Sequence, residues 1–153
     1  MFRSRGSSRL RQGGVILLAQ QLLSSGPIPP ITLIFIILQA AIYTGFIPFM
    51  DPDKTHNLCL LPRAILNKKQ WYRIILPVLM HGDDLHLYYN MISFLYKGKN
   101  LERLLGSIRF LSILITFIIS TPLVHIFLAW AGEEILDMNI FMHECTVGFS
   151  VSK

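Results

Sequence analysis

Two polar residues, His86 and Asn90, lie four positions apart in an otherwise largely apolar stretch, so on a helix their side chains share one face. Neutral N–H donors that converge on one point can stabilise an oxyanion, the charge that develops when a nucleophile attacks a carbonyl. His81 lies five residues before His86 and is a third candidate for this cluster. The alternative function of the same residues is to form packing hydrogen bonds between membrane helices.

The sequence offers residues for two further chemistries. A metal site would need His81, Asp83 and His86, but their spacing places no convincing fourth ligand, so we expect no metal and no cofactor. A nucleophile is offered by Gly148-Phe149-Ser150, since a serine beside a small residue can be approached closely by another helix and by a substrate. On this tripeptide alone, a serine in a frayed tail is the alternative.

The composition indicates that these residues lie in a membrane protein. The 153 residues are 52% hydrophobic and 15% charged, with a mean hydropathy of +0.51, whereas soluble domains are about 25% charged. The net charge of +5 does not indicate nucleic acid, because the basic residues flank apolar stretches and form no single stripe. Two cysteines are too few for a disulfide scaffold, and the length fits one domain.

The charge-free stretches predict an all-α fold, a bundle of transmembrane helices. Residues 31–50 and 110–132 are each long enough to cross a hydrocarbon core of about 30 Å. Between them, 85–99 predicts a shorter span that begins after a helix cap at Asp83 or Asp84 and carries His86 and Asn90. Residues 146–153 are expected to begin a fourth helix.

The distribution of charge predicts which side each segment faces. Residues 1–30 hold four arginines and no acids, and the segment between the second and third spans is also basic, so both are predicted to be cytoplasmic. Residues 14–23 predict a short amphipathic helix at the membrane interface rather than a cleaved signal peptide. Cys59 and Cys145 then face the same non-cytoplasmic side, which allows a disulfide but leaves open whether the two approach each other.

Several strings in family order resemble the rhomboid intramembrane serine proteases. They are WYR from Trp71 to Arg73, HGDDLHLYYN from His81 to Asn90, NLERLLGS from Asn100 to Ser107, and GFS. The basic N-terminus, IPPITL and CTVGFS look closest to a branch that is associated with the endoplasmic reticulum membrane. The resemblance implies a six-helix bundle with a water-filled site that cleaves transmembrane proteins.

The same resemblance implies a role for individual residues. Ser150, with Gly148 before it, matches the nucleophile, and His86 and Asn90 match the oxyanion-stabilising pair, which His81 would support. Trp71 and Arg73 match structural residues of the first loop. Glu102 and Arg103 match a structural pair after the second helix.

The sequence departs from the family pattern at its C-terminal end. Val151 replaces the glycine that follows the serine, no histidine follows Ser150, and neither His125 nor His143 matches the histidine base of the sixth helix. We therefore expect a truncated rhomboid domain over residues 31–153 that is inactive alone. The alternatives are a catalytically dead protein that binds substrates or a full-length rhomboid, and a structural fragment. The expected partners are transmembrane proteins and lipids, and no nucleic acid.

Overall fold

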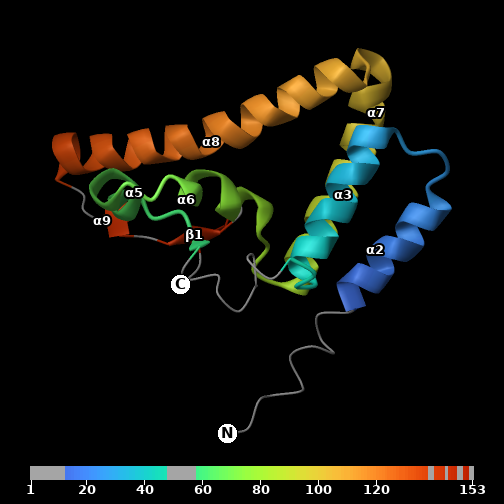
Figure 1. The fold of residues 1–153 in the computed structure, drawn as a ribbon, viewed down its shortest axis with the longest axis horizontal. Coiled ribbons are helices and arrows are strands. Elements are labelled where there is room, and N and C mark those ends of the chain that lie inside the picture. The colour runs from blue at the N-terminus through green and yellow to red at the C-terminus, as the bar shows by residue number, and fades with distance from the viewer. Residues whose placement is uncertain (1–12, 48–57, 138–139, 144, 148–149, 152–153) are drawn as a thin grey trace, which may run out of the picture.

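A computed structural model describes residues 13–47, 58–137, 140–143, 145–147 and 150–151 (Figure 1). The described part is helical apart from one pair of two-residue strands, which confirms the predicted fold class. Its elements are α2 (Gly13–Ser24), α3 (Pro30–Tyr43), α5 (Pro62–Lys68), α6 (Tyr72–Ile75), the 3-10 helix η3 (Leu76–Leu79), α7 (Asp84–Leu105), α8 (Ser107–Leu136), α9 (Ile140–His143), β1 (Thr146–Val147) and β2 (Ser150–Val151).

Helix α3 is shorter than the predicted span 31–50. It has 14 residues, about 21 Å at 1.5 Å per residue, and it follows Pro29 and begins with Pro30. It ends at Tyr43 because Gly45 takes a left-handed conformation (φ +78°) and turns the chain. The N–H of Gly45 then donates to Ile42 O (3.1 Å) and that of Phe46 to Ala41 O (3.0 Å), a Schellman cap.

The two long helices, α7 and α8, are separated by a single glycine. Gly106 has φ +80°, and it ends α7 and precedes α8. Helix α8 extends beyond the predicted 110–132 at both ends and contains Pro122 in its interior. Among the described helices, only α8, over residues 107–135, is both long and apolar enough to cross a membrane.

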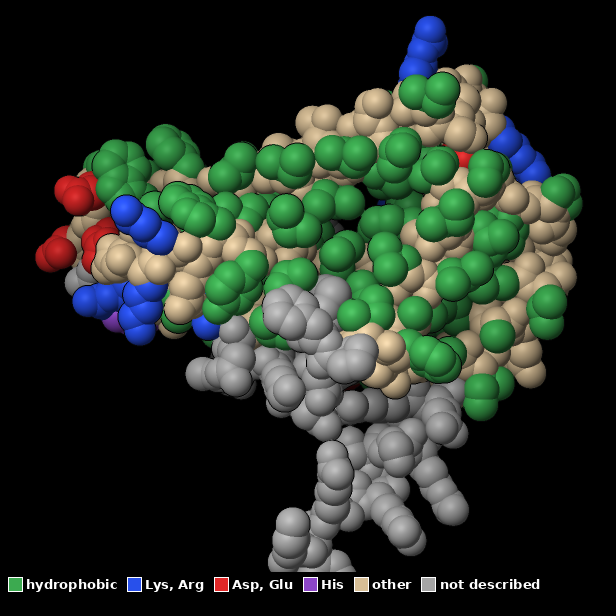
Figure 2. Space-filling view, viewed as in Figure 1, with side chains coloured by type: hydrophobic (Ala, Val, Ile, Leu, Met, Phe, Trp, Pro, Cys, Tyr) green, Lys and Arg blue, Asp and Glu red, His purple; other side chains and the backbone are tan. Residues whose placement is uncertain are grey.

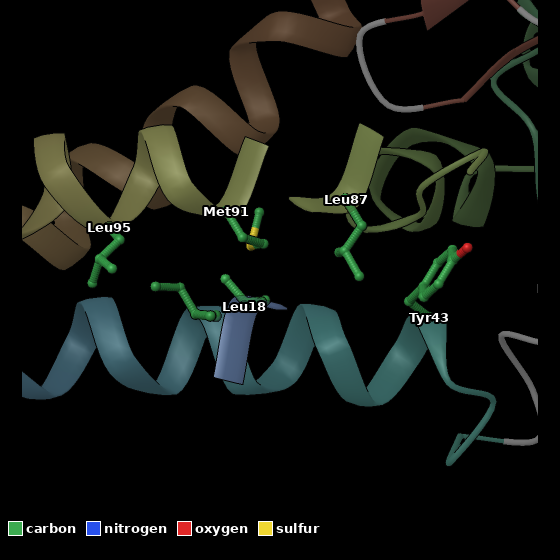
Figure 3. Packing of buried hydrophobic residues seen from close by; sticks show 6 residues of the cluster. Leu18, Tyr43, Leu87, Met91 and Leu95 are labelled. Atoms are coloured by element: carbon green, nitrogen blue, oxygen red, sulfur yellow. The ribbon is translucent and has the colours of Figure 1, made fainter. Parts of the chain in front are cut away.

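Helices α2, α3 and α7 pack around one apolar cluster (Figure 3), formed by Leu18, Ile36, Tyr43, Leu87, Met91 and Leu95. Helix α2 runs parallel to α7: the N–H of Gly14 donates to Asp84 Oδ2 (2.5 Å), Gln21 Nε2 to Tyr96 Oη (2.9 Å), and Lys99 Nζ to Ser25 O. The predicted helix is therefore present, but it packs lengthwise on α7. Leu18 is buried against α7, and the position of this helix at the membrane interface stays a prediction.

The segments α5, α6, η3 and α9 form a second group that packs beneath α8 in Figure 1, away from α2. A disulfide between Cys59 and Cys145, whose Cα atoms lie 5.4 Å apart, joins the loop before α5 to the chain before β1. The strands pair antiparallel, with Thr146 opposite Val151 and Val147 opposite Ser150. The fourth helix expected from residue 146 was wrong for these four residues, because they pair as a hairpin.

Apolar side chains cover much of the surface (Figure 2). Along α8 they are exposed around the helix, and they include Ile108, Ile115, Phe117, Val124, Phe127, Leu128 and Ile135. In water, exposing so large an apolar area would be unfavourable, whereas lipid or neighbouring membrane helices would accept it. The surface thus agrees with a helical membrane bundle.

Candidate active site

The structure brings His81, His86 and Asn90 to one cavity of about 340 Å³. His86 and Asn90 are half-buried on one face of α7, as their spacing predicts, and His81 lies in the turn before the helix. The remaining walls come from α3, η3, α8 and other turns of α7, namely Phe35, Gln39, Val78, Met91, Ser93, Phe94, Lys97, Leu114, Phe117 and Ile118. Polar donors therefore converge in a cavity whose walls are mainly apolar.

Two aspartates fix the start of α7 and with it the position of His86. Asp83 Oδ1 accepts a hydrogen bond from the backbone N–H of His86 (2.7 Å), which caps the helix as the sequence predicts. Asp84 has a role that the sequence does not indicate: its carboxylate accepts from the N–H of Gly14 and so binds the first turn of α2. Asp83 therefore caps α7, and Asp84 links the start of α7 to the start of α2.

The His81 ring is buried and lies edge-to-face with that of His86, with ring centroids 5.4 Å apart. Burial, together with the neighbouring His86, lowers the pKa of His81 to about 4, although Asp83 partly opposes this shift. His81 is therefore neutral at neutral pH. Its Nδ1 has no hydrogen-bond partner among the described residues, so it is available to a water or to a substrate group.

Gln39 was missed as a site residue. It lies in the middle of α3, is 1% exposed and lines the same cavity, and its Oε1 has no partner in the described part of the chain. The signal in the sequence was a lone amide in the charge-free stretch 31–50, since a polar side chain at membrane depth usually faces a protein interior or a wet cavity. Gln39 adds a hydrogen-bond acceptor to the wall opposite α7.

Glu102 and Arg103 do not pair with each other, but both hold the chain that leads into α3. Glu102 accepts from Ile31 N (2.9 Å), Thr32 N (2.7 Å), Thr32 Oγ1 (2.8 Å) and Ser107 Oγ (2.7 Å). Arg103 Nη2 donates to Pro27 O (2.6 Å). Glu102 lies beyond the predicted span 85–99. Burial raises the pKa of its carboxyl, but these hydrogen bonds outweigh burial and lower the pKa overall.

Trp71 and Arg73 lie at the start of α6 and differ in their surroundings. Trp71 is exposed, so the described residues leave most of its ring uncovered. Arg73 is half-buried: its Nε donates to Gln70 Oε1 (2.5 Å), and its Nη1 donates to the carbonyl oxygen of Cys59 (2.9 Å). Arg73 therefore ties the start of α6 to the loop at Cys59, and the family role that the resemblance implies for it stays a prediction.

Ser150 is placed by its backbone in β2, and its side chain and all of Gly148 lie outside the described residues. The paired strand β1 contacts η3, whose Val78 lines the cavity. Two further histidines follow Asn90 in the sequence. His143 Nε2 contacts Arg63 Nη1 (2.5 Å), and His125 Nε2 is buried without a partner in the described structure. No three histidine, cysteine or acidic residues in the described ranges form a metal-binding group.

A family model described as the rhomboid domain matches residues 68–152, more than half of the chain. The chain belongs to the rhomboid family. It is 39% identical to human rhomboid-related protein 4 over 151 residues, which is 97% of this chain and 45% of the human protein. It is 39% identical to the mouse protein of the same name over 140 residues, which is 90% of this chain and 42% of the mouse protein.

A plant relative, rhomboid-like protein 15 of Arabidopsis thaliana, is 33% identical over 100 residues, 64% of this chain and 25% of its own. The chain thus spans less than half the length of the relatives it matches. No solved structure gave a significant match. The rhomboid family is embedded in membranes, and membership agrees with the long apolar helix α8.

Proposed function

We propose that the chain carries part of the active site of a rhomboid serine endopeptidase that cleaves transmembrane proteins. The supporting observation is that His81, His86 and Asn90 meet in one cavity, in the order and spacing of the family motif. Ser150 is the nucleophile, and the N–H donors of His86 and Asn90 stabilise the oxyanion formed when its oxygen attacks the scissile carbonyl. His81 and Gln39 hold water or substrate in the cavity.

The 153 residues alone are proposed to be inactive. A serine hydroxyl needs a base within hydrogen-bond reach, and no histidine follows Ser150 in this sequence. The second candidate function, binding of transmembrane segments or of a full-length rhomboid without cleavage, follows from the same observation. The cavity walls combine apolar side chains with a few polar groups. Such walls suit a transmembrane helix in which one turn leaves backbone polar groups exposed.

A chimera tests the proposal. Residues 1–151 would be fused to the C-terminal remainder of human rhomboid-related protein 4, which follows the region matching Ser150 and would supply the base. In detergent, a fluorophosphonate probe should label the chimera at Ser150, and Ser150→Ala should abolish labelling. Residues 1–153 alone should stay unlabelled. Asn90→Ala should slow labelling of the chimera by roughly 10²-fold, the scale of losing one oxyanion donor.

The outcomes separate the two functions. If the intact human protein is labelled and the chimera is not, the protease proposal is wrong and the binding function takes its place. If residues 1–153 are labelled at Ser150 without the added segment, the proposed inactivity is wrong, and another group must activate the serine.

We further propose that the protein lies in the endoplasmic reticulum membrane with its N-terminus in the cytoplasm. The four arginines of residues 3–11 support this side. The position of α2 favours the opposite side. Gly13 and Gly14 lie beside Asp84, at the end of the bundle that is predicted to face the lumen. A direct measurement of the side that the N-terminus faces distinguishes the two orientations.

Labelling of Ser4→Cys in sealed microsomes provides it. Cys59 and Cys145 are the other cysteines of the sequence and are joined in a disulfide, so the new thiol is the reactive one. A membrane-impermeant maleimide should label the variant before the vesicles are opened. Labelling only after opening would place the N-terminus in the lumen, in agreement with the packing of α2.

A further inference from the structure

The surroundings of the Cys59–Cys145 disulfide differ between its two sulfurs. Cys59 is 1% exposed and belongs to an apolar cluster with Ile42, Leu58 and Met80, whereas Cys145 is half-buried at the margin of that cluster. A thiolate from solution therefore reaches the sulfur of Cys145 more easily than that of Cys59.

The charge beside the bond favours the same direction of attack. Arg73 Nη1 lies 3.8 Å from Cys59 Sγ, and the guanidinium is held there by its hydrogen bonds to the Cys59 carbonyl and to Gln70. A neighbouring arginine stabilises a thiolate, and thiol–disulfide exchange is faster when the departing sulfur is the better stabilised anion. Burial in the apolar cluster opposes a thiolate at Cys59, and the guanidinium offsets this cost, so attack at the more exposed Cys145 releases Cys59 beside its cation.

We propose that the Cys59–Cys145 bond is a thiol–disulfide exchange site for a dithiol reductant, attacked at Cys145 and assisted by Arg73. In the first step a thiolate of the reductant bonds to Cys145 Sγ, the disulfide breaks, and its electron pair leaves on Cys59 Sγ. In the second step the other thiolate of the reductant attacks its own sulfur in the mixed disulfide and releases Cys145 as a thiolate. The reductant loses two electrons and becomes a disulfide, and solvent supplies the protons.

Opening the bond frees the segment that contains Ser150. Cys145 is followed directly by β1, which pairs with β2, and Val147 lies opposite Ser150 in this pair. Between Cys145 and the serine there is no other covalent tie to the first loop. The exchange chemistry is independent of the proposed protease function; only its effect on a reacting serine rests on that function.

The experiment uses residues 1–153 in detergent, first incubated briefly with glutathione and then quenched with acid and alkylated. Peptide mapping should find glutathione on Cys145 and the alkylating reagent on Cys59. Reduction by dithiothreitol should be roughly tenfold slower in Arg73→Gln, because the leaving thiolate loses its cation. Lys68→Gln is the matched control: it removes an exposed cation of the same loop and should leave the rate unchanged.

Glutathione found mainly on Cys59, or an Arg73→Gln rate equal to that of Lys68→Gln, would overturn the proposal. Loosening of the loop by Arg73→Gln would instead expose the bond and accelerate reduction. Arg73→Lys separates the two effects, since it keeps a cation near the sulfur and should retain most of the wild-type rate. None of these readouts depends on the reactivity of Ser150, so failure here leaves the protease proposal standing.

Discussion

Replacing Glu102 with alanine should lower the free energy of unfolding by on the order of 3 to 5 kcal/mol, the largest effect expected from a single substitution in this chain. The carboxylate is 2% exposed and accepts from both backbone N–H groups at the start of α3 and from two hydroxyls. Without it the two buried donors of Thr32 stay unpaired, the half-buried Ile31 and Ser107 lose their acceptor, and the positive end of α3 loses its anion. Unfolding of residues 1–153 in mixed micelles with increasing denaturing detergent would measure the change.

Two variants make the Glu102 result specific. Glu102→Gln keeps one acceptor oxygen and loses the charge, so it should lie between wild type and Glu102→Ala. Glu134→Ala removes an exposed carboxylate near the end of α8 and should change stability by less than about 0.5 kcal/mol. If Glu102→Ala differs from wild type by no more than Glu134→Ala does, Glu102 does not hold the start of α3.

Alanine at Gly14 should release α2 from α7 and destabilise the chain by about 2 kcal/mol. A Cβ atom built there would lie 2.6 Å from the backbone oxygen of Asp84 and 2.8 Å from its Oδ1. The backbone oxygen belongs to the start of α7 and cannot rotate away, so α2 must move. Movement would also expose Leu18, which is buried in the cluster of Figure 3.

Gly13→Ala is the matched control, because among the described residues a Cβ at Gly13 meets only Asp84 Oδ2, at an ordinary 3.4 Å. Alanine favours helix over glycine by up to about 1 kcal/mol, so Gly13→Ala should be neutral or slightly stabilising, the opposite sign to Gly14→Ala. Amide hydrogen exchange across α2 would detect its release directly. A Gly14→Ala variant as stable as Gly13→Ala, with α2 equally protected, would show that the close contact tolerates a side chain.

Sequence patterns predicted the features that depend on neighbouring residues. The spacing of His86 and Asn90 predicts a shared helix face, and Asp83 is recognisable as a cap because its acceptor lies three residues before a free N–H. The charge-free stretch 31–50 predicted a helix but not its end, because Gly45 breaks the helix without interrupting the apolar pattern. Local patterns were thus reliable for the presence of a helix and less so for its length.

The features that depend on distant residues were not predictable in this way. The contacts of Asp84 with Gly14 and of Gln39 with the cavity require α2 and α3 to be placed against α7, and a single sequence gives no register for that packing. The cysteines were predicted to face one side of the membrane. Because 86 residues separate them, only the tertiary fold determines whether they approach each other. Ser150 was expected at the start of a helix and instead lies in a strand, since Val147 and Val151 favour extended backbone.

The disulfide also constrains how many times the intervening chain crosses the membrane. Its two sulfurs must lie on the same side of the bilayer, so the chain between Cys59 and Cys145 crosses an even number of times. That stretch contains two long helices, and by composition only α8 qualifies as a membrane span on its own. One crossing would leave the sulfurs on opposite sides. For a chain in which α8 crosses the membrane, the covalent bond therefore requires a second crossing, and α7, with its histidine and asparagine, is the other long helix of that stretch.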